Sequence, residues 1–458
     1  MKLYNSLSRK LEEFRPIKAG EVSLYTCGPT VYDHVHIGNL RTYIFEDTLR
    51  RVMKSNGLKL KHVMNITDVD DKTIARSHEN YPADEPREAL RKLTAKYEKI
   101  FYADAKKVGI DLGNSRIVKA TEHIEDMQAL IRQIPGKYIT KDGIYFNIEK
   151  YNDYGRLVKL DRSHSHHRIN NDEYDKDHVA DFALWKTKSG DEPAWDFEIE
   201  GKNLEGRPGW HIECSAMSVK YLSQPFDIHT GGVDLIFPHH ENEIAQSSSA
   251  GGQPLAKYFL HGEHLLVDDH KMSKSLKNFY TIDDILSKGF DPLAFRLLVL
   301  QVHYRHQLNF TWRSLESAQA FLQRLQTWAD LKFQPKLGHK KDVGMNYTKI
   351  LTSIKQSLSD DLNSGQGLAI LSGLVNRAEQ EGVDTNKLQL LLEQLDELLG
   401  LDLAQRSDIS NSVKDLISAR ETARKKSDWA RADELRKKLS TEGIELNDTP
   451  HGPVWTRS

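Results

Sequence analysis

Cysteine is scarce in this chain, because only Cys27 and Cys214 occur among its 458 residues. Two thiols in so long a chain argue against a secreted scaffold held by disulfides, and we expect a cytoplasmic protein. No apolar run approaches the length of a membrane span, and the first residues are charged throughout and lack the apolar core of a signal peptide. These absences favour a globular chain without a membrane partner, and its length predicts about two to four domains.

A surplus of charge is also missing, because 64 Lys and Arg residues nearly balance 66 Asp and Glu residues. A uniformly basic surface for nucleic acid is therefore excluded, and any RNA contact must use local patches. One basic patch runs from Arg420 to Lys438, where eight Lys or Arg residues accompany four Asp or Glu residues. Such a charge run is also typical of a solvated helix face.

The first part of the chain predicts a βαβ unit of a parallel sheet. We expect a strand at 22–26, a helix from about 38 to 56 and a second strand at 58–66. Residues 116–209 interrupt this pattern with short alternating segments, which we interpret as an insertion. The sheet pattern resumes near Trp210 and includes a strand at 226–229.

Beyond residue 291, apolar residues recur every three or four positions and predict a helical bundle whose apolar stripes form its core. The remaining residues form a small unit with a basic helix followed by a strand and turn. We therefore expect a parallel-sheet domain in two halves, at 1–115 and 210–250, with an insertion at 116–209 between them. A linking region at 251–314, the bundle at 315–404 and a C-terminal domain at 405–458 are expected to follow.

Two segments carry residues suited to phosphate chemistry. His36-Ile37-Gly38-Asn39 lies at the predicted strand-to-helix turn, where free N–H groups and the helix dipole favour phosphate and Gly38 permits close approach. His36 and Asn39 can donate to phosphate oxygens as these gain charge. The segment 271–275, KMSKS, holds two lysines three residues apart that can neutralise a polyphosphate, although an exposed loop is the alternative interpretation.

The two cysteines each lie in a motif-rich stretch, and HHENE places His239 and Glu243 four residues apart, on one face of a helix if that segment is helical. Two thiolates, an imidazole and a carboxylate make an acceptable Zn²⁺ shell. The alternatives are inert buried cysteines and an ordinary surface pair on a helix.

Together, HIGN and KMSKS resemble the HIGH and KMSKS signatures of class I aminoacyl-tRNA synthetases. The resemblance narrows to the cysteinyl-tRNA synthetases through five blocks: YTCGPTVYDHVHIGNLRTY, NITDVDDK, GRPGWHIECSAM, FDIHTGGVDLIFPHHENEIAQ and KMSKSLKNF. It covers the chain from its first residues to its last, and implies an α/β fold: a Rossmann-type parallel-sheet catalytic domain with an inserted connective domain, a helical bundle and a small anticodon-binding domain. Two residues depart from the pattern: Asn39 replaces the second histidine of HIGH, and Lys277 stands where the family commonly has glycine.

The resemblance implies that the chain is a monomer that activates L-cysteine with ATP and Mg²⁺ and passes it to the 3′ adenosine of the tRNA for cysteine. It assigns one zinc ion to Cys27, Cys214, His239 and Glu243. A thiol at zinc is deprotonated whereas a serine hydroxyl is not, so we expect no editing domain. Because four protein ligands are typical of a closed structural site, we expect the substrate sulfur to join as a fifth ligand or to displace Glu243.

The resemblance assigns further roles residue by residue. His36 and Asn39 are expected at the α-phosphate, with Lys271 and Lys274 on the leaving pyrophosphate. ATP-binding is further assigned to Gly38, Gly231, Gly232, Asp234 and Ser273, cysteine-binding to Thr67, Trp210 and His229, and anticodon contacts to Arg424, Trp429, Asp433 and Trp455. The acidic residues Asp68, Asp70 and Asp71 are expected to be mainly structural.

Two other functions stay open from the sequence. A related ligase that passes cysteine to a small amine would lack an anticodon domain, and residues 405–458 speak against it. A zinc-containing RNA-binding paralogue without catalysis would be expected to lose the lysines of KMSKS, both of which are present.

Overall fold

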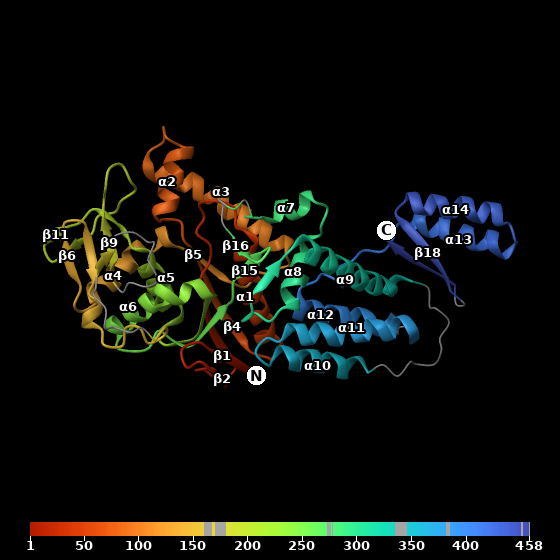
Figure 1. Ribbon diagram of the computed structural model, residues 1–458, viewed down its shortest axis with the longest axis horizontal. Coiled ribbons are helices and arrows are strands. Elements are labelled where there is room, and N and C mark those ends of the chain that lie inside the picture. Colours follow the sequence, from red (N-terminus) through yellow and green to blue (C-terminus); the bar gives the residue numbers. More distant parts are fainter. Residues whose placement is uncertain are drawn as a thin grey trace. The chain divides into compact units, whose positions relative to one another are not determined.

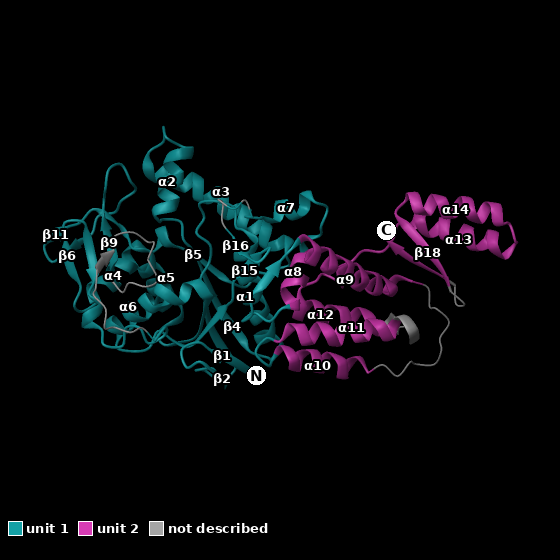
Figure 2. Cartoon of the chain, viewed as in Figure 1, with its two compact units in different colours: residues 1–292, 302–311, 359–362 teal, residues 293–301, 312–358, 363–458 magenta. Residues whose placement is uncertain are grey.

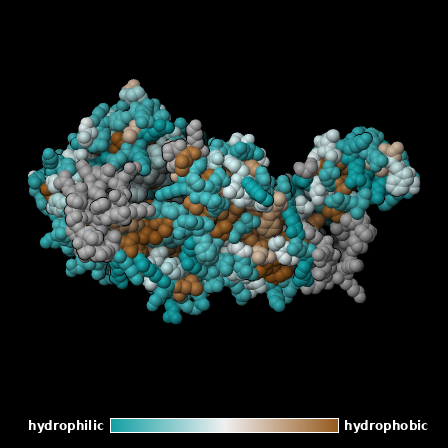
Figure 3. Space-filling model, in the orientation of Figure 1, coloured by the Kyte–Doolittle hydropathy of each residue, from teal (hydrophilic) through white to brown (hydrophobic). Residues whose placement is uncertain are grey.

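The computed structural model describes residues 1–159, 167–169, 180–272, 276, 278–334, 346–381, 385–449 and 452–457. These residues divide into two compact units (Figure 2). Unit 1 contains residues 1–292, 302–311 and 359–362, and unit 2 contains 293–301, 312–358 and 363–458. On the face drawn in Figure 3, hydrophilic residues cover most of the surface and hydrophobic residues form scattered patches. Among the described helices, none is long and apolar enough to cross a membrane.

A parallel sheet of five strands forms the centre of unit 1 (Figure 1). Its strand order is β14-β13-β3-β4-β5, and Leu24 of β3 pairs with His62 of β4 and with Ile228 of β13. Every residue of β13 is buried, as is typical of a parallel strand covered on both faces. The predicted Rossmann-type sheet is confirmed, with strands β3 (Glu21–Thr26), β4 (Lys59–Ile66), β5 (Arg116–Lys119), β13 (Phe226–Gly232) and β14 (Ala256–Gly262).

Helix α1 (Ile37–Ser55) makes the crossover between β3 and β4, which confirms the predicted βαβ unit. Its apolar residues, among them Leu40, Ile44 and Leu49, are fully buried. The helix ends before Gly57, whose φ of 79° is a conformation that L side chains rarely adopt. The other helices around the sheet are α2 (Asp71–Asn80), α3 (Pro86–Lys107), α5 (Trp210–Leu222) and α6 (Glu241–Gly251).

The strand order changes direction between β3 and β13. From β3 the chain proceeds outward through β4 to β5, and from β13 it proceeds outward the other way to β14. Such a switch point opens a crevice at the carboxyl ends of the two central strands, where α/β proteins bind ligands. Cys27 follows the end of β3, and Gly231 and Gly232 end β13, so the topology places predicted site residues at this crevice.

The segment interpreted as an insertion forms a separate, mainly antiparallel sheet of order β12-β9-β7-β6, with β8 also paired to β9. The described sheet packs around Trp185, Phe146, Phe182 and Phe197. The elements are η1 (Ala120–Glu122), α4 (Ile124–Gln133), β6 (Tyr138–Thr140), β7 (Gly143–Phe146), η2 (Ile148–Lys150), β8 (His167–Ile169), β9 (Ala180–Thr187), β10 (Glu198–Ile199), β11 (Lys202–Asn203) and β12 (Gly206–Pro208).

Two expected boundaries differ from the observed strands. Residues 116–119 form β5 of the parallel sheet, so the inserted sheet begins later than the expected residue 116. Strand β14 extends the parallel sheet beyond the expected end at residue 250. The remaining elements of unit 1 are β1 (Lys2–Asn5), β2 (Lys10–Glu13), β15 (Leu265–Val267), β16 (His270–Lys271), α7 (Ile282–Ser287) and β17 (Leu308–Phe310).

Unit 2 is mainly helical, as the periodicity predicts. Leu315, Leu322, Leu325, Leu388 and Leu395 are fully buried and form part of the bundle core. The helices are α8 (Pro292–Gln301), α9 (Trp312–Asp330), η5 (Leu331–Phe333), α10 (Tyr347–Leu358), α11 (Ser364–Glu381) and α12 (Thr385–Leu399). The C-terminal part of the same unit comprises α13 (Asn411–Lys425), α14 (Trp429–Thr441) and the hairpin β18 (Ile444–Thr449) and β19 (Gly452–Arg457).

Candidate active site and metal centre

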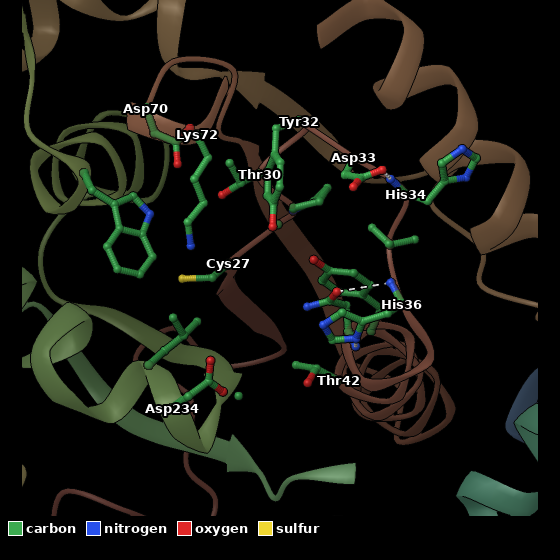
Figure 4. A pocket seen from close by; sticks show the side chains of 18 of the residues that line it. Cys27, Thr30, Tyr32, Asp33, His34, His36, Thr42, Asp70, Lys72 and Asp234 are labelled. Carbon is green, nitrogen blue, oxygen red and sulfur yellow. Dashed lines mark hydrogen bonds between the residues drawn. The ribbon is translucent and has the colours of Figure 1, made fainter. Parts of the chain in front are cut away.

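A pocket of about 570 Å³ lies in unit 1 at the carboxyl end of β3 (Figure 4). Its walls come from the segment that follows β3, the first turns of α1 and α2, and the segment after β13. In Figure 4 the Cys27 sulfur and the Lys72 side chain point into this space. Six residues assigned from the sequence line the pocket: Cys27, His36, Asn39, Trp210, Gly232 and Asp234.

His36 caps the N-terminus of α1. The backbone N–H of Asn39 donates to His36 Nδ1 at 3.1 Å, and the backbone N–H of His36 donates to Asn39 Oδ1 at 3.3 Å. Because Nδ1 accepts, the proton of a neutral His36 ring lies on Nε2. The Phe279 ring packs edge-on against the imidazole at a centroid distance of 4.8 Å. The imidazole is therefore held as a hydrogen-bond donor beside the helix N-terminus.

At three glycines of the predicted nucleotide site, neighbouring atoms lie too close for a larger residue to fit without a shift. A Cβ on Gly38 would lie 2.5 Å from Met272 Cε, so Met272 of KMSKS packs directly on the HIGN turn. A Cβ on Gly232 would lie 2.5 Å from Asp234 Oδ1, and one on Gly231 would lie 2.7 Å from a Leu235 methyl group. Lys271 is exposed on β16. Ser273, Lys274 and the departure at Lys277 lie outside the described residues.

The four predicted metal ligands converge from four separate segments. Cys27 follows β3, Cys214 lies on α5, His239 belongs to the short turn η4 (Ile236–His240) after η3 (Val233–Leu235), and Glu243 lies in the first turn of α6. One ligand atom from each residue lies within 4.8 Å of the others, and all four side chains are buried. His239 Nε2 is 2.9 Å from Glu243 Oε1, as the spacing of four residues predicts.

Two further histidines, which the ligand prediction omitted, lie beside this cluster. His229 and His240 form an overlapping ligand group with Cys27 and Glu243. His229 Nε2 is 2.7 Å from Glu243 Oε2, and His240 Nε2 is 3.4 Å from Cys27 Sγ. His229, expected near the amino acid, is thus fully buried against a ligand residue and does not line the pocket. The motif HHENE shows two histidines but no local signal that chooses between them.

The electrostatics of the cluster favour charged ligand forms at two positions. Burial raises the pKa of Cys214, but hydrogen bonds with Cys27 and His239 outweigh it and bring that pKa down to about 6. Burial likewise opposes ionisation of Glu243, but His229 and His239 lower its pKa to about 2. Burial, and to a lesser extent a hydrogen bond with Cys214, raises the pKa of the Cys27 thiol well above its usual range. A carboxylate and one readily formed thiolate therefore stand side by side.

Two other residues predicted to contact cysteine are placed differently. Trp210 lines the pocket, and its ring lies 4.3 Å from that of His239, centroid to centroid. Thr67 is buried and does not line the pocket, and its hydroxyl donates to Glu213 Oε2 at 3.2 Å. Burial raises the pKa of Glu213 well above its usual range.

The acidic residues after β4 have partners within the protein, and two of them, Asp70 and Asp71, also line the pocket. Asp70 caps α2 by accepting from the Thr73 N–H at 2.7 Å. Asp68 accepts from the Thr121 hydroxyl at 2.6 Å. Asp71 lines the pocket and forms ion pairs with Lys186, at 2.9 Å, and with Arg207. Each carboxylate therefore has partners within the protein.

The four residues assigned to the anticodon differ in exposure. Trp429 is 59% exposed at the start of α14, and Asp433 is exposed one turn later. Arg424 forms an ion pair with Asp448 at 2.6 Å. Trp455 is only 3% exposed and packs with Val413, Leu439 and Leu446 in a small core. Because Trp455 is buried, its ring has no free face for stacking on a base. The expected anticodon contact of Trp455 is therefore wrong, and Trp455 is a core residue.

Comparison with known proteins covers the whole chain. A family model described as the tRNA synthetases class I (C) catalytic domain matches residues 13–320, and one described as the cysteinyl-tRNA ligase anticodon binding domain matches residues 406–452. The cysteine–tRNA ligase of Brachyspira hyodysenteriae is 42% identical over 481 residues, which cover 99% of this chain and 98% of that protein. That of Chlamydia muridarum is 42% identical over 476 residues, which cover 98% of each.

Solved structures support the fold. Mycobacterium tuberculosis methionyl-tRNA synthetase in complex with methionyl-adenylate gives a TM-score of 0.60 at 11% identity, covering 84% of this chain and 92% of that chain. An Agrobacterium radiobacter LeuRS complex gives a TM-score of 0.58 at 10% identity, covering 86% and 85%. With relatives of about 40% identity along its full length, the chain belongs to the cysteine–tRNA ligases, a family of class I tRNA synthetases.

Proposed function

We propose that this chain activates cysteine with ATP, forming cysteinyl-adenylate and pyrophosphate, and then passes the cysteinyl group to the 3′ adenosine of its tRNA. The observation that carries the proposal is the convergence of Cys27, Cys214, His239 and Glu243 beside a pocket lined by His36 and Asn39. The match to the anticodon-binding domain favours this function over transfer of cysteine to a small amine.

The donor set fits zinc. Two sulfurs, an imidazole nitrogen and a carboxylate oxygen are ligands that Zn²⁺ accepts, and soft thiolates select against the hard cations Mg²⁺ and Ca²⁺. The overlapping group with His229 and His240 keeps further nitrogen donors next to Cys27 and Glu243. When bound, zinc would supply a Lewis acid that takes the substrate as thiolate and leaves serine, with its hard protonated hydroxyl, unbound.

The chain's own residues then orient the two reactants. The substrate carboxylate is the nucleophile, so the protein's task is to position it and to stabilise charge on the α-phosphate. His36 Nε2–H is suited to donate to the phosphate oxygens, whereas the N–H groups of Ile37 and Asn39 already donate to the Tyr280 carbonyl and to His36 Nδ1. Asp234, beside Gly232, is suited to accept from a ribose hydroxyl. Lys271 and Lys274 would neutralise the leaving pyrophosphate, and Mg²⁺ would arrive with ATP, held mainly by its phosphates.

We further propose that α14 contacts the anticodon. The exposed Trp429 ring offers a stacking face, and Asp433, four residues later on the same helix, can accept from a base edge. Lys425, Lys426, Lys437 and Lys438 would contact phosphates without reading sequence. Arg424, held by Asp448, would serve mainly to shape this surface. The monomeric state and cytoplasmic location stay predictions.

Cysteine-dependent ATP–pyrophosphate exchange, followed by charging of cysteine tRNA, tests the proposal. We expect both reactions with cysteine and neither with serine. Exchange without charging would favour a ligase that uses another acceptor, and the absence of cysteine-dependent exchange would exclude an activating enzyme.

A further inference from the structure

A buried chain of hydrogen bonds connects the neighbours of the two cysteines. The Thr67 hydroxyl donates to Glu213 Oε2 at 3.2 Å and accepts from Asn65 Nδ2 at 3.1 Å. Asn65 Oδ1 accepts from the Gly28 N–H at 2.9 Å. Gly28 directly follows Cys27, and Glu213 directly precedes Cys214. The chain therefore runs from one cysteine-bearing segment to the other through the end of β4.

The segment after Cys27 also packs closely against β4. A Cβ on Gly28 would lie 1.7 Å from the backbone oxygen of Asn65, so no other residue fits without a shift of the backbone. Farther along, the Val31 N–H donates to the Thr67 carbonyl at 3.1 Å, and the Thr67 N–H donates to the Pro29 carbonyl at 3.0 Å. These contacts fix residues 28–31 against the strand end that carries Thr67.

Glu213 is the one carboxyl group in this chain of bonds, and it is 0% exposed. It belongs to neither of the ligand groups formed by the described residues. A buried carboxyl group is costly unless it is hydrogen-bonded, and bonds in such a medium are strong and expensive to break. Among the described residues its hydrogen-bond partner is Thr67, whose hydroxyl links it to Asn65.

We propose that Glu213 is a positioning residue of the metal centre, which acts through Thr67 and Asn65 to fix the separation of Cys27 and Cys214. The inference rests on the proposed function, in which these two cysteines hold the metal. Metal shells tolerate errors of only about 0.2 Å in ligand distance, and residues that hydrogen-bond behind the ligands set those positions. Glu213 supplies that support across two segments that are distant in the sequence.

Metal affinity and the spectrum of the cobalt-loaded chain test this role. Zn²⁺ affinity is measured by competition with a chelator, and Co²⁺ absorption reports the Co–thiolate bonds and their geometry. Glu213→Ala and the isosteric Thr67→Val should each weaken metal affinity about 10- to 100-fold and alter the cobalt spectrum. Glu213→Gln keeps an oxygen that accepts from Thr67, and should stay near wild type.

A matched control separates positioning from simple loss of packing. Leu222 is buried at the end of the same helix, so Leu222→Ala leaves a cavity there without touching the bonded chain. It should lower the melting temperature while metal affinity and cobalt spectrum stay as in wild type. If Glu213→Ala does not fold, Thr67→Val decides the question, because it changes neither shape nor volume appreciably.

The outcomes distinguish the two proposals. A wild-type chain that binds neither Zn²⁺ nor Co²⁺ overturns the metal centre of the proposed function, and this inference with it, whereas cysteine-dependent exchange tests the activation of cysteine separately. Tight binding by wild type, together with an unchanged spectrum and affinity in folded Glu213→Ala or Thr67→Val, overturns the inference alone. Weakening by Glu213→Ala and Thr67→Val, with rescue in Glu213→Gln, supports it.

Discussion

His36 and Asn39 hold each other at the first turn of α1. Each backbone N–H donates to the other's side chain, at 3.1 Å to His36 Nδ1 and 3.3 Å to Asn39 Oδ1. The Asn39 side chain accepts from the His36 backbone N–H and so completes the cap, whereas the His36 ring is held by the backbone N–H of Asn39, which any residue at that position would supply. The imidazole therefore carries the donor function of the signature, with its proton on Nε2.

Replacing His36 should separate catalysis from capping. Serine is also a strong N-cap, so His36→Ser keeps the helix start while removing the imidazole. We expect kcat for pyrophosphate exchange to fall about 100- to 1000-fold, the usual loss for one donor to a developing oxyanion. His36→Ala should lose the same activity and, in addition, about 1 kcal/mol of stability. Exchange by His36→Ser at the wild-type rate would contradict this role.

Glu46 on α1 should make stability depend on pH. Burial raises its pKa to about 8, although the Thr230 hydroxyl and Arg50 act in the other direction. In the unfolded chain a glutamate has a pKa of about 4.3. Between these two pKa values Glu46 is protonated in the folded chain and ionised in the unfolded chain. The free energy of unfolding should therefore fall as pH rises through this window.

Glu46→Gln removes that dependence and keeps an acceptor for Thr230, which donates to Glu46 Oε1 at 3.0 Å. We expect wild type and variant to melt at similar temperatures near about pH 5, with the variant more stable by a few kcal/mol above about pH 8. Melting curves across this range measure the difference. A variant that loses stability in parallel with wild type as pH rises would exclude Glu46 as the cause.

A methyl group at Gly28 should damage the metal site. In Gly28→Ala the added Cβ would meet the Asn65 backbone oxygen, which a rotamer change cannot relieve. We expect a loss of about 1–3 kcal/mol or more, together with loss of bound zinc. Gly373→Ala on α11 is the control, because no atom lies within 4 Å of the new Cβ. Calorimetry and metal content check both variants, and normal zinc content in Gly28→Ala would contradict the prediction.

We expect Trp429 to affect the binding of tRNA and not the activation of cysteine. Trp429→Ala removes the exposed ring at the start of α14, and loss of one stacked base should raise KM for tRNA about 5- to 100-fold. Pyrophosphate exchange should not change. Leu390 on α12 is 61% exposed, so Leu390→Ala serves as a matched surface truncation. An equal effect of both variants on KM for tRNA would contradict stacking of the Trp429 ring on a base.

The sequence predicts those parts of the molecule whose signal is local. The unit β3-α1-β4 is predicted by the spacing of its apolar residues and by Gly57, which ends the helix. The metal residues Cys27 and Cys214 lie in recognisable motifs. Strand β5, only four residues long, has too little pattern to be separated from the insertion. Its place in the sheet comes from pairing with β4, which is a contact distant in sequence.

The surroundings of the metal ligands could not be predicted in the same way. His229, His239 and His240 are chemically alike, yet His229 on β13 and His239 on η4 contact Glu243, whereas His240 lies against Cys27. Glu213 looks like any charged helix residue until burial and the Thr67 bond are known. The exposure of Trp429 and the burial of Trp455 likewise depend on how α14 packs against the last hairpin.

Cysteine-dependent pyrophosphate exchange in wild type and Cys214→Ser, with zinc measured in each preparation, tests the central claim most directly. The account predicts one zinc per wild-type chain, exchange with cysteine but not serine, and loss of both zinc and cysteine-dependent exchange in Cys214→Ser. Full cysteine-dependent exchange in a zinc-free variant would contradict selection of the substrate by a metal at this cluster.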